Sequence, residues 1–356
     1  MGKKMLMKGN EAIAEAAIRA GCRLFFGYPI TPQNEIPEYM SRELPARGGV
    51  FLQAESEIAA INMVYGAAGA GARVMTSSSG PGIALKGEGV SYIACAQLPC
   101  VIVDITRGGP GLGNISPAQS DYLHVVKGMA HGDFHNIVLA PASVQEAADL
   151  VAEAFDLADR YRNPVVLMAD GMIGQMMEPV RFTGRGGGTP PPKPWATTGS
   201  RNAEDGKRRT VYAVAINPED LEAINLEMQA KYERIQRDEV RCELFHTDGA
   251  ELLFVAYGTT SRIVRNVVRS LREEGVRAGL LRPITLWPFP LEKIRELAEL
   301  RHVRAFLTVE MCLGQMVEDV ERAVGCRKPV RFFGKTAGVM PQPADIAQRA
   351  RSLLGR

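Results

Sequence analysis

Three polar side chains in the first third of the chain stand where strands are expected to end. Thr31 carries a hydroxyl between two prolines, Glu57 follows one short apolar run, and Arg107 ends another. In open α/β sheets, ligands bind beyond the carboxyl ends of the strands. We therefore expect a hydroxyl, a carboxylate and a guanidinium to share one site at that edge of a sheet.

Thr31 has two compatible interpretations. A β-branched residue before Pro32 is held out of the helical region, so its side chain has a defined place just beyond a strand end. The Thr-Pro pair is also a favourable helix start, with Thr31 as N-cap and Pro32 at the first helical position. The pattern alone favours the cap. The same hydroxyl can cap a helix in the free protein and face a substrate in a complex.

Glu55 and Glu57 are two residues apart in otherwise apolar surroundings. In an extended segment their side chains would point the same way, whereas at a helix start they diverge and one can be buried. Desolvation raises the pKa of a buried carboxyl group, which suits a group that shares a proton with a ligand nitrogen. Equally, both carboxylates can simply favour a helix N-terminus through its dipole.

Arg107 opens a glycine-rich loop after an apolar strand. A guanidinium fixed there can bind a carboxylate in a bidentate way, although an ordinary surface arginine fits the pattern as well. The following loop lacks the spacing of the dinucleotide fingerprint, and Pro110 removes a donor. Residues 77–82, including Ser79, lack the Gly-Lys-Ser/Thr ending of a P-loop and favour a tight turn near the site over phosphate contact.

Other polar residues give weaker indications. Asp121, His124 and His131 do not have convincing metal-ligand spacing, and we expect no metal site in this chain. The turn 310–315 offers polar groups that either face a partner or cap a helix. No nucleophile triad is present, and a threonine, a glutamate and an arginine cannot by themselves break a carbon–carbon bond. Chemistry at this site would need a cofactor.

The pattern of apolar runs predicts an α/β fold with a doubly wound, mostly parallel sheet over residues 1–180. We expect helices over 10–20 with Asn10 as cap, over 58–71 with Ser56 as cap, over 83–96, and from a capping box at Ser143 to residue 161. The predicted strands alternate with these helices and cover residues 22–26, 50–54, 73–77, 101–106, 137–140 and 165–168.

Two further regions follow. Residues 181–246 are expected to form a linker or arm, with a Gly- and Pro-rich run over 184–192, and a connector helix over 221–240. Residues 247–356 are expected to form a second, smaller α/β domain without sequence repeat of the first. Its predicted strands are 252–256, 276–281, 303–309 and 330–333, and its predicted helices are 261–274, 291–300 and 315–323.

Composition limits the possible partners. The 356 residues include 42 basic and 40 acidic side chains, a net charge of +2 that offers no field for nucleic acid or an anionic membrane. The apolar runs are far shorter than the roughly 20 residues that span a bilayer. The first residues do not resemble a signal peptide, so we expect a cytoplasmic location. The six cysteines never occur as Cys-x-x-Cys and are expected to be reduced.

Several motifs, taken together, resemble the α subunit of 2-oxoacid:ferredoxin oxidoreductases. The resemblance covers nearly the whole chain, because residues 310–317 look like the transketolase C-terminal-type domain of that subunit. Within the family the branched-chain (ketoisovalerate) enzymes are most similar and the 2-oxoglutarate enzymes second. The motifs are Tyr28-Pro29-Ile30-Thr31-Pro32, Gln53-Ala54-Glu55-Ser56-Glu57-Ile58-Ala59-Ala60, Met75-Thr76-Ser77-Ser78-Ser79-Gly80-Pro81-Gly82 and Arg107-Gly108-Gly109-Pro110.

The resemblance implies a pyrimidine-binding domain of a thiamine diphosphate enzyme that acts on a 2-oxoacid and coenzyme A. Glu57, with Glu55 as the fallback, would bind the aminopyrimidine, and Pro29 and Ser79 would also line the cofactor site. Thr31 and Arg107 would contact the substrate.

The same resemblance places the other cofactors and the partners. A β subunit would hold the diphosphate and Mg²⁺, and iron–sulfur clusters would lie on β and ferredoxin-like subunits, with a γ subunit as a further partner. The lack of cysteine clusters in this chain fits that division. Two alternatives stay open: half of a non-oxidative thiamine decarboxylase or transketolase-like enzyme, and a catalytically silent scaffolding subunit.

Overall fold

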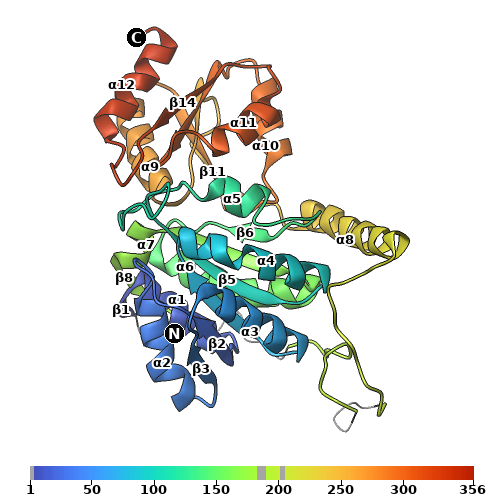
Figure 1. Cartoon of the computed structure of the whole chain (residues 1–356). Helices are drawn as coiled ribbons and strands as arrows, with labels where there is room; N and C mark the ends of the chain where they lie inside the picture. The colour runs from blue at the N-terminus through green and yellow to red at the C-terminus, as the bar shows by residue number, and fades with distance from the viewer. Residues whose placement is uncertain (1–3, 183–189, 201–204) are drawn as a thin grey trace.

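The computed structural model describes residues 4–182, 190–200 and 205–356 and has a larger and a smaller α/β part (Figure 1). The Gly- and Pro-rich run expected over 184–192 lies outside the described residues up to position 189. Within the described residues, no helix combines the length and the apolar character needed to cross a membrane.

The larger part is built on a seven-stranded sheet in the order β12-β6-β7-β5-β4-β2-β3. All neighbours are parallel except β12, which is antiparallel to β6. The six predicted strands are confirmed, and the short β12 was not predicted. The strands are β2 (Leu24–Gly27), β3 (Val50–Gln53), β4 (Val74–Ser78), β5 (Cys100–Thr106), β6 (Ile137–Leu139), β7 (Pro164–Asp170) and β12 (Thr285–Trp287).

Helices cover the sheet, with α1, α2 and α6 packed together as one group and α3 and α4 as another. The antiparallel pair β1 (Met5–Lys8) and β8 (Met177–Val180) joins the two ends of this part and was not predicted. The helices are α1 (Gly9–Arg19), α2 (Glu35–Ala46), α3 (Glu57–Gly69), α4 (Pro81–Cys95), α5 (Tyr122–Lys127), α6 (Val144–Tyr161) and α7 (Gly171–Gln175).

Helix starts test the predicted caps. The Ser56 and Ser143 hydroxyls accept from the backbone N–H groups of Ala59 and Glu146, each at 3.1 Å, so both caps are confirmed. The prediction for Asn10 was wrong. Helix α1 begins one residue earlier, and the buried Asn10 amide is used instead for a long-range contact with the loop after β2.

The smaller part has a five-stranded sheet in the order β14-β13-β10-β11-β9, with only β9 antiparallel. The predicted α/β pattern is confirmed, whereas β9 and the last helix were not predicted. Its strands are β9 (Cys242–Phe245), β10 (Leu252–Val255), β11 (Ala278–Pro283), β13 (Ala305–Glu310) and β14 (Val330–Gly334). Its helices are α9 (Gly258–Glu273), α10 (Leu291–Glu299), α11 (Met316–Val324) and α12 (Pro343–Leu354), and α8 (Pro218–Asp238) precedes it.

The buried side chain of Gln119 joins the two parts. Its Nε2 donates to the Tyr257 carbonyl at 2.9 Å, and its Oε1 accepts from the Met311 backbone N–H at 2.9 Å. The Gln119 backbone N–H also donates to the Met311 carbonyl at 3.0 Å. Both polar ends of the amide are therefore paired with backbone of the smaller part, which fixes its position over the carboxyl edge of the larger sheet.

Replacing Gln119 with alanine should destabilise the chain. The Tyr257 carbonyl and the Met311 N–H would each lose a buried partner, at a cost of about 1 to 3 kcal/mol per group. Urea unfolding should show a lower midpoint for Gln119→Ala, whereas Gln229→Ala, on the exposed face of α8, serves as the control. An unchanged midpoint in Gln119→Ala would show that this contact does not hold the two parts together.

Candidate functional site

Arg107 is held at the end of β5 by two loops. It is only 6% exposed, and its two terminal nitrogens donate to the carbonyl oxygens of Thr31 (2.8 Å) and Leu112 (2.9 Å). Its Nε has no hydrogen-bond partner among the described residues. The interpretation as an ordinary surface arginine is therefore wrong, and the structure brings Arg107 beside Thr31 as the parallel strand order predicted.

Side-chain hydrogen bonds from α1 and α7 fix the loop that carries Thr31. The side-chain amides of Asn10 and Gln175 both donate to the Pro32 carbonyl, at 2.7 and 2.8 Å, and both also reach the Glu35 carboxylate. These contacts hold the half-buried Thr31 at the carboxyl edge of the sheet.

The prediction that Thr31 caps a helix was wrong. A turn closes from the Gln33 N–H to the Ile30 carbonyl at 3.1 Å, so helix α2 begins only at Glu35. The Thr31 hydroxyl accepts from the side-chain amide of Asn34 at 3.2 Å instead. Thr31 lies next to Arg107, which contacts it through the Thr31 carbonyl oxygen.

The two glutamates have different environments. Glu57 begins helix α3 and is 6% exposed, whereas Glu55 is exposed, because the chain turns into the helix between them. The Glu57 carboxylate packs against the first turn of α4. A Cβ on Gly82 would lie 2.6 Å from Glu57 Oε1 and 2.2 Å from Ser78 Oγ, so glycine is required for this close approach.

Unpaired polar groups are buried around the first turn of α4, against which Glu57 packs. The hydroxyls of Ser78 and Ser79 are fully buried and have no hydrogen-bond partner among the described residues. The same holds for the Lys86 ammonium, one turn further along α4. Burial lowers the pKa of Lys86 to about 8, and the nearby Glu57 only partly opposes this. Lys86 was not predicted as a site residue, since it lies in an Ala- and Gly-rich helix that resembles core.

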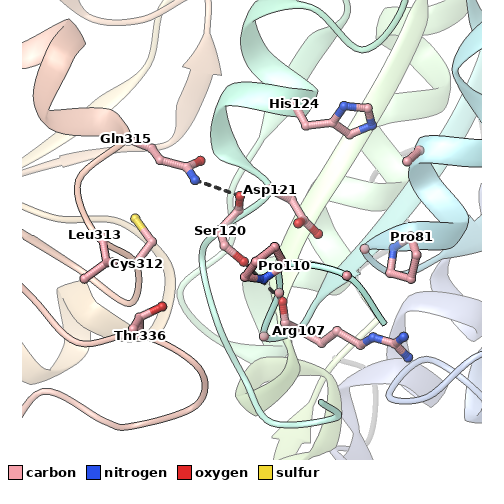
Figure 2. A pocket seen from close by; sticks show the side chains of 15 residues that line it. Pro81, Arg107, Pro110, Ser120, Asp121, His124, Cys312, Leu313, Gln315 and Thr336 are labelled. Atoms are coloured by element: carbon pink, nitrogen blue, oxygen red, sulfur yellow. Dashed lines mark hydrogen bonds between the residues drawn. The ribbon is translucent and has the colours of Figure 1, made fainter. Parts of the chain in front are cut away.

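A cavity of about 380 Å³ opens beside Arg107, between the two parts of the chain (Figure 2). The larger part contributes Pro81, Ala84, Arg107, Asp121 and His124, and the smaller part contributes Cys312, Leu313, Gln315 and Thr336. The half-buried His124 has a pKa lowered by burial, which favours the neutral ring near pH 7. The described lining is thus largely apolar, with Arg107 as its permanent cation.

The turn after β13 shapes the other wall of the cavity. The buried Glu310 carboxylate accepts from the backbone N–H groups of Gln315, Met316 and Val317, at 2.9 to 3.1 Å. Of the two interpretations of this turn, the helix cap is confirmed. Gln315 then donates through Nε2 to the Ser120 carbonyl at 2.9 Å, which ties this wall to the larger part.

Family comparisons cover both parts of the chain. Residues 15–236 match the family "Pyruvate flavodoxin/ferredoxin oxidoreductase, thiamine diP-bdg", and residues 250–346 match "Pyruvate:ferredoxin oxidoreductase core domain II". The chain therefore belongs to the 2-oxoacid:ferredoxin oxidoreductases, enzymes that work as complexes of subunits. Its larger part is the thiamine diphosphate-binding domain of that family, which confirms the resemblance drawn from the motifs.

Among individual relatives, sequence identity differs between two kinds of enzyme of this family. The ketoisovalerate oxidoreductase subunit VorB of Methanothermobacter thermautotrophicus is 50% identical over 98% of each chain. The 2-oxoglutarate synthase subunit KorA of Methanothermobacter marburgensis is 40% identical over 98% of this chain and 99% of its own length. The order of similarity expected from the motifs is thus confirmed.

Solved structures agree with the fold. The 2-oxoglutarate:ferredoxin oxidoreductase from Magnetococcus marinus matches with a TM-score of 0.85 and 26% identity. The match covers 99% of this chain and 66% of that chain. A split gene transketolase, at 16% identity and a TM-score of 0.62 over 98% of both chains, supports the fold alone.

Replacing Lys86 with methionine should stabilise the chain at neutral pH. The pKa of Lys86 falls from 10.5 in the unfolded chain to about 8 in the folded one. The unfolded chain therefore binds the proton more tightly, and below pH 8 the buried cation costs about 3 kcal/mol of stability. Lys86→Met should raise the unfolding free energy at pH 7, and its advantage over the wild type should shrink as pH rises from 8 to 10.5.

Comparing the two chains across this pH range cancels the titration of the groups they share. An equal or lower stability of Lys86→Met at pH 7, or an advantage that does not depend on pH, would contradict the account of Lys86 as an uncompensated buried cation.

Proposed function

We propose that this chain supplies half of an intersubunit active site for oxidative decarboxylation of a branched-chain 2-oxoacid. The reaction would convert 2-oxoisovalerate and coenzyme A to the acyl-CoA and carbon dioxide, with the electrons passing to ferredoxin. The observation that carries the proposal is a buried guanidinium, Arg107, fixed beside Thr31 at the rim of a largely apolar cavity. A carboxylate with a branched apolar side chain matches that arrangement.

Thiamine diphosphate fits the residues around Glu57. A buried carboxylate, next to buried hydroxyls that have no partner in the described chain, can hydrogen-bond the ring nitrogen and amino group of an aminopyrimidine. Glu57 would hold that ring, with Ser79 and the exposed Pro29 at the edges of the site and Glu55 kept as the fallback. The cofactor would supply the electron sink needed to break the bond to the carboxylate carbon.

Thr31 and Arg107 would bind the substrate. Two of the Arg107 nitrogens are held by backbone carbonyls, so the guanidinium is already oriented and little side-chain entropy is lost when a carboxylate binds. Each terminal nitrogen carries a second N–H, which can act as a charge-assisted donor to a carboxylate. The Thr31 hydroxyl, which accepts from Asn34, can donate its own hydrogen to an oxygen of the oxoacid.

The cavity lining supports a branched-chain substrate over 2-oxoglutarate. A second carboxylate on the substrate would need a second cation, and the described residues that line the cavity contain no lysine and no arginine besides Arg107. Pro81, Ala84 and Leu313 offer apolar contact instead. The higher identity to a ketoisovalerate enzyme subunit supports the same choice.

Partner subunits would complete the site. A β subunit would hold the diphosphate and Mg²⁺, and iron–sulfur clusters on β and ferredoxin-like subunits would carry the electrons, with a γ subunit as a further member. The relatives are themselves named as subunits, which supports this division. The cysteines of this chain, which are free thiols scattered over both parts, supply no cluster ligands in this proposal.

The coexpressed complex should prefer branched-chain oxoacids. Given thiamine diphosphate and coenzyme A, it should reduce a low-potential dye with 2-oxoisovalerate at a higher kcat/KM than with 2-oxoglutarate or pyruvate, because the distal carboxylate of 2-oxoglutarate finds no cation. A higher kcat/KM for 2-oxoglutarate would assign the second member of the family. If the complex did not reduce the dye with any of these three oxoacids, the proposed function would be overturned.

Glu57→Ala should abolish most of the turnover of that complex. Loss of a charge-assisted hydrogen bond costs about 1.5 to 3 kcal/mol, and more where the bond acts mainly in the transition state, so a loss of at least about tenfold is expected. Glu88→Ala, on the exposed face of α4, is the matched control. Retained turnover in Glu57→Ala together with loss in Glu55→Ala would move the cofactor contact to Glu55.

Thr31→Val should raise the KM for the oxoacid, because valine keeps the shape of threonine and deletes the hydroxyl. A neutral hydrogen bond is worth about 0.5 to 1.5 kcal/mol, so a change of about two- to tenfold is expected. Steady-state kinetics of the complex measure it. Unchanged KM and turnover would show that Thr31 acts only in the local turn with Asn34.

A further inference from the structure

Two carboxyl groups meet under the cavity floor. Asp104 is a fully buried residue of the apolar strand β5, and Asp121 precedes helix α5 and lines the cavity. Their carboxyl groups lie close enough to interact with each other, and both are near the backbone N–H of Gly80. Gly80 has a φ of 45°, the left-handed region that favours glycine, and it begins helix α4.

These carboxyl groups cannot both be ionised without a strong penalty. Neither oxygen of Asp104 has a hydrogen-bond partner among the described residues, and Asp121 Oδ2 also lacks one. Two adjacent carboxylates in a buried site repel each other, so one keeps its proton. A hydrogen bond from the Asp104 carboxyl O–H to the Asp121 carboxylate satisfies both groups.

The surroundings place the proton on Asp104. Desolvation raises the pKa of Asp104 well above its usual range, and the neighbouring Asp121 raises it further. Desolvation raises the pKa of Asp121 to about 6, against the opposing effects of the Gly80 N–H and Arg107. The other titratable groups that face the pair are the half-buried His124 on α5 and the buried phenol of Tyr257.

Arg107 connects the pair to the cavity. An ideal Cβ on Gly80 would lie 3.8 Å from Arg107 Nε and 4.0 Å from Asp121 Oδ2, so the guanidinium and the carboxylate both lie next to this residue. Figure 2 shows Asp121 and Arg107 on the same side of the cavity, both from the larger part of the chain. The charge of the carboxyl pair therefore acts directly on the guanidinium that would bind the substrate.

We propose that Asp104 and Asp121 hold one shared proton at neutral pH, and that this proton keeps Arg107 able to bind the 2-oxoacid carboxylate. The identity of the ligand in this inference, a 2-oxoacid, rests on the proposed function, whereas the shared proton does not. With the proton present, the pair carries a single negative charge. Loss of the proton would leave two negative charges beside Arg107. These charges would offset the positive charge of the guanidinium and repel an incoming carboxylate. Asp104 is thus a positioning residue that acts through Asp121.

Linkage fixes the sign of the pH effect. Because oxoacid binding is stronger when the pair is protonated, binding must also raise the affinity of the pair for its proton. As pH rises above neutral and the shared proton is lost, the KM for the oxoacid should increase by up to about tenfold for each pH unit. The effect on kcat should be smaller, because saturating substrate retains the proton.

The proton can be tested on the full chain without any partner. Infrared spectra at neutral pH should contain the carbonyl stretch of a protonated carboxylic acid, and the difference between wild type and Asp104→Asn should contain that band. The difference isolates the pair from other buried carboxyl groups such as Glu310. Asp121→Asn should remove the band as well, because the introduced amide would donate to an ionised Asp104, and this variant serves if Asp104→Asn does not fold.

The coupling can be tested in the complex. Asp121→Asn removes the ionisation, so its KM should stay flat over the alkaline range in which the wild-type KM rises, while the exposed Asp133→Asn should follow the wild type. Absence of the infrared difference band would overturn the shared proton. An equal rise of KM in wild type and Asp121→Asn would overturn the coupling. A complex that turns over no 2-oxoacid would refute the proposed function and leave the infrared result standing.

Discussion

The site depends on the buried amide of Gln119, which bonds the backbone of both Tyr257 and Met311. Parallel strands bring the loops after β2, β4 and β5 to one edge of the larger sheet, but that edge alone is open. The smaller part covers this edge because two sets of hydrogen bonds hold the two parts together. One is made by Gln119, and the other joins Gln315 to the Ser120 carbonyl. Side chains from positions 81 to 336 can therefore line one cavity.

Electrostatics decides how this cavity can be used. Arg107 is its fixed cation, and backbone carbonyls rather than carboxylates hold the terminal nitrogens. The guanidinium therefore keeps most of its charge for a ligand. Asp121 carries the opposing charge, and the proton that it shares with Asp104 keeps the pair at a single negative charge. On the other side of the first turn of α4, Lys86 is a buried cation without a hydrogen-bond partner in the described chain. Such uncompensated groups reduce stability and are typical of functional sites.

The sequence predicted the features that depend on the spacing of apolar residues and on the order of strands and helices. Alternating apolar runs predicted the parallel sheet, which then brought Thr31 and Arg107 together. The residue pattern alone could not choose between Glu55 and Glu57, because the choice depends on where the chain enters α3, and the resemblance to the family favoured Glu57. The pattern failed for the Thr31 cap, since the turn at residues 30–33 delays α2. Asp104 was missed inside an apolar strand, although a lone acid in such a run is itself a usable signal. The strands that were missed, β1, β8, β9 and β12, are short and pair antiparallel, outside the alternating pattern of parallel strands and helices.

The central claim is that Arg107 binds the substrate carboxylate, and Arg107→Lys tests it most directly. Lysine keeps the charge but loses the planar fork and the two backbone contacts that orient it. The measurement is the KM for 2-oxoisovalerate in the complete complex, with kcat from the same titration. We predict a KM raised by about ten- to a hundredfold, the equivalent of about 1.5 to 3 kcal/mol, with a smaller change in kcat. A KM equal to that of the wild type would contradict the account.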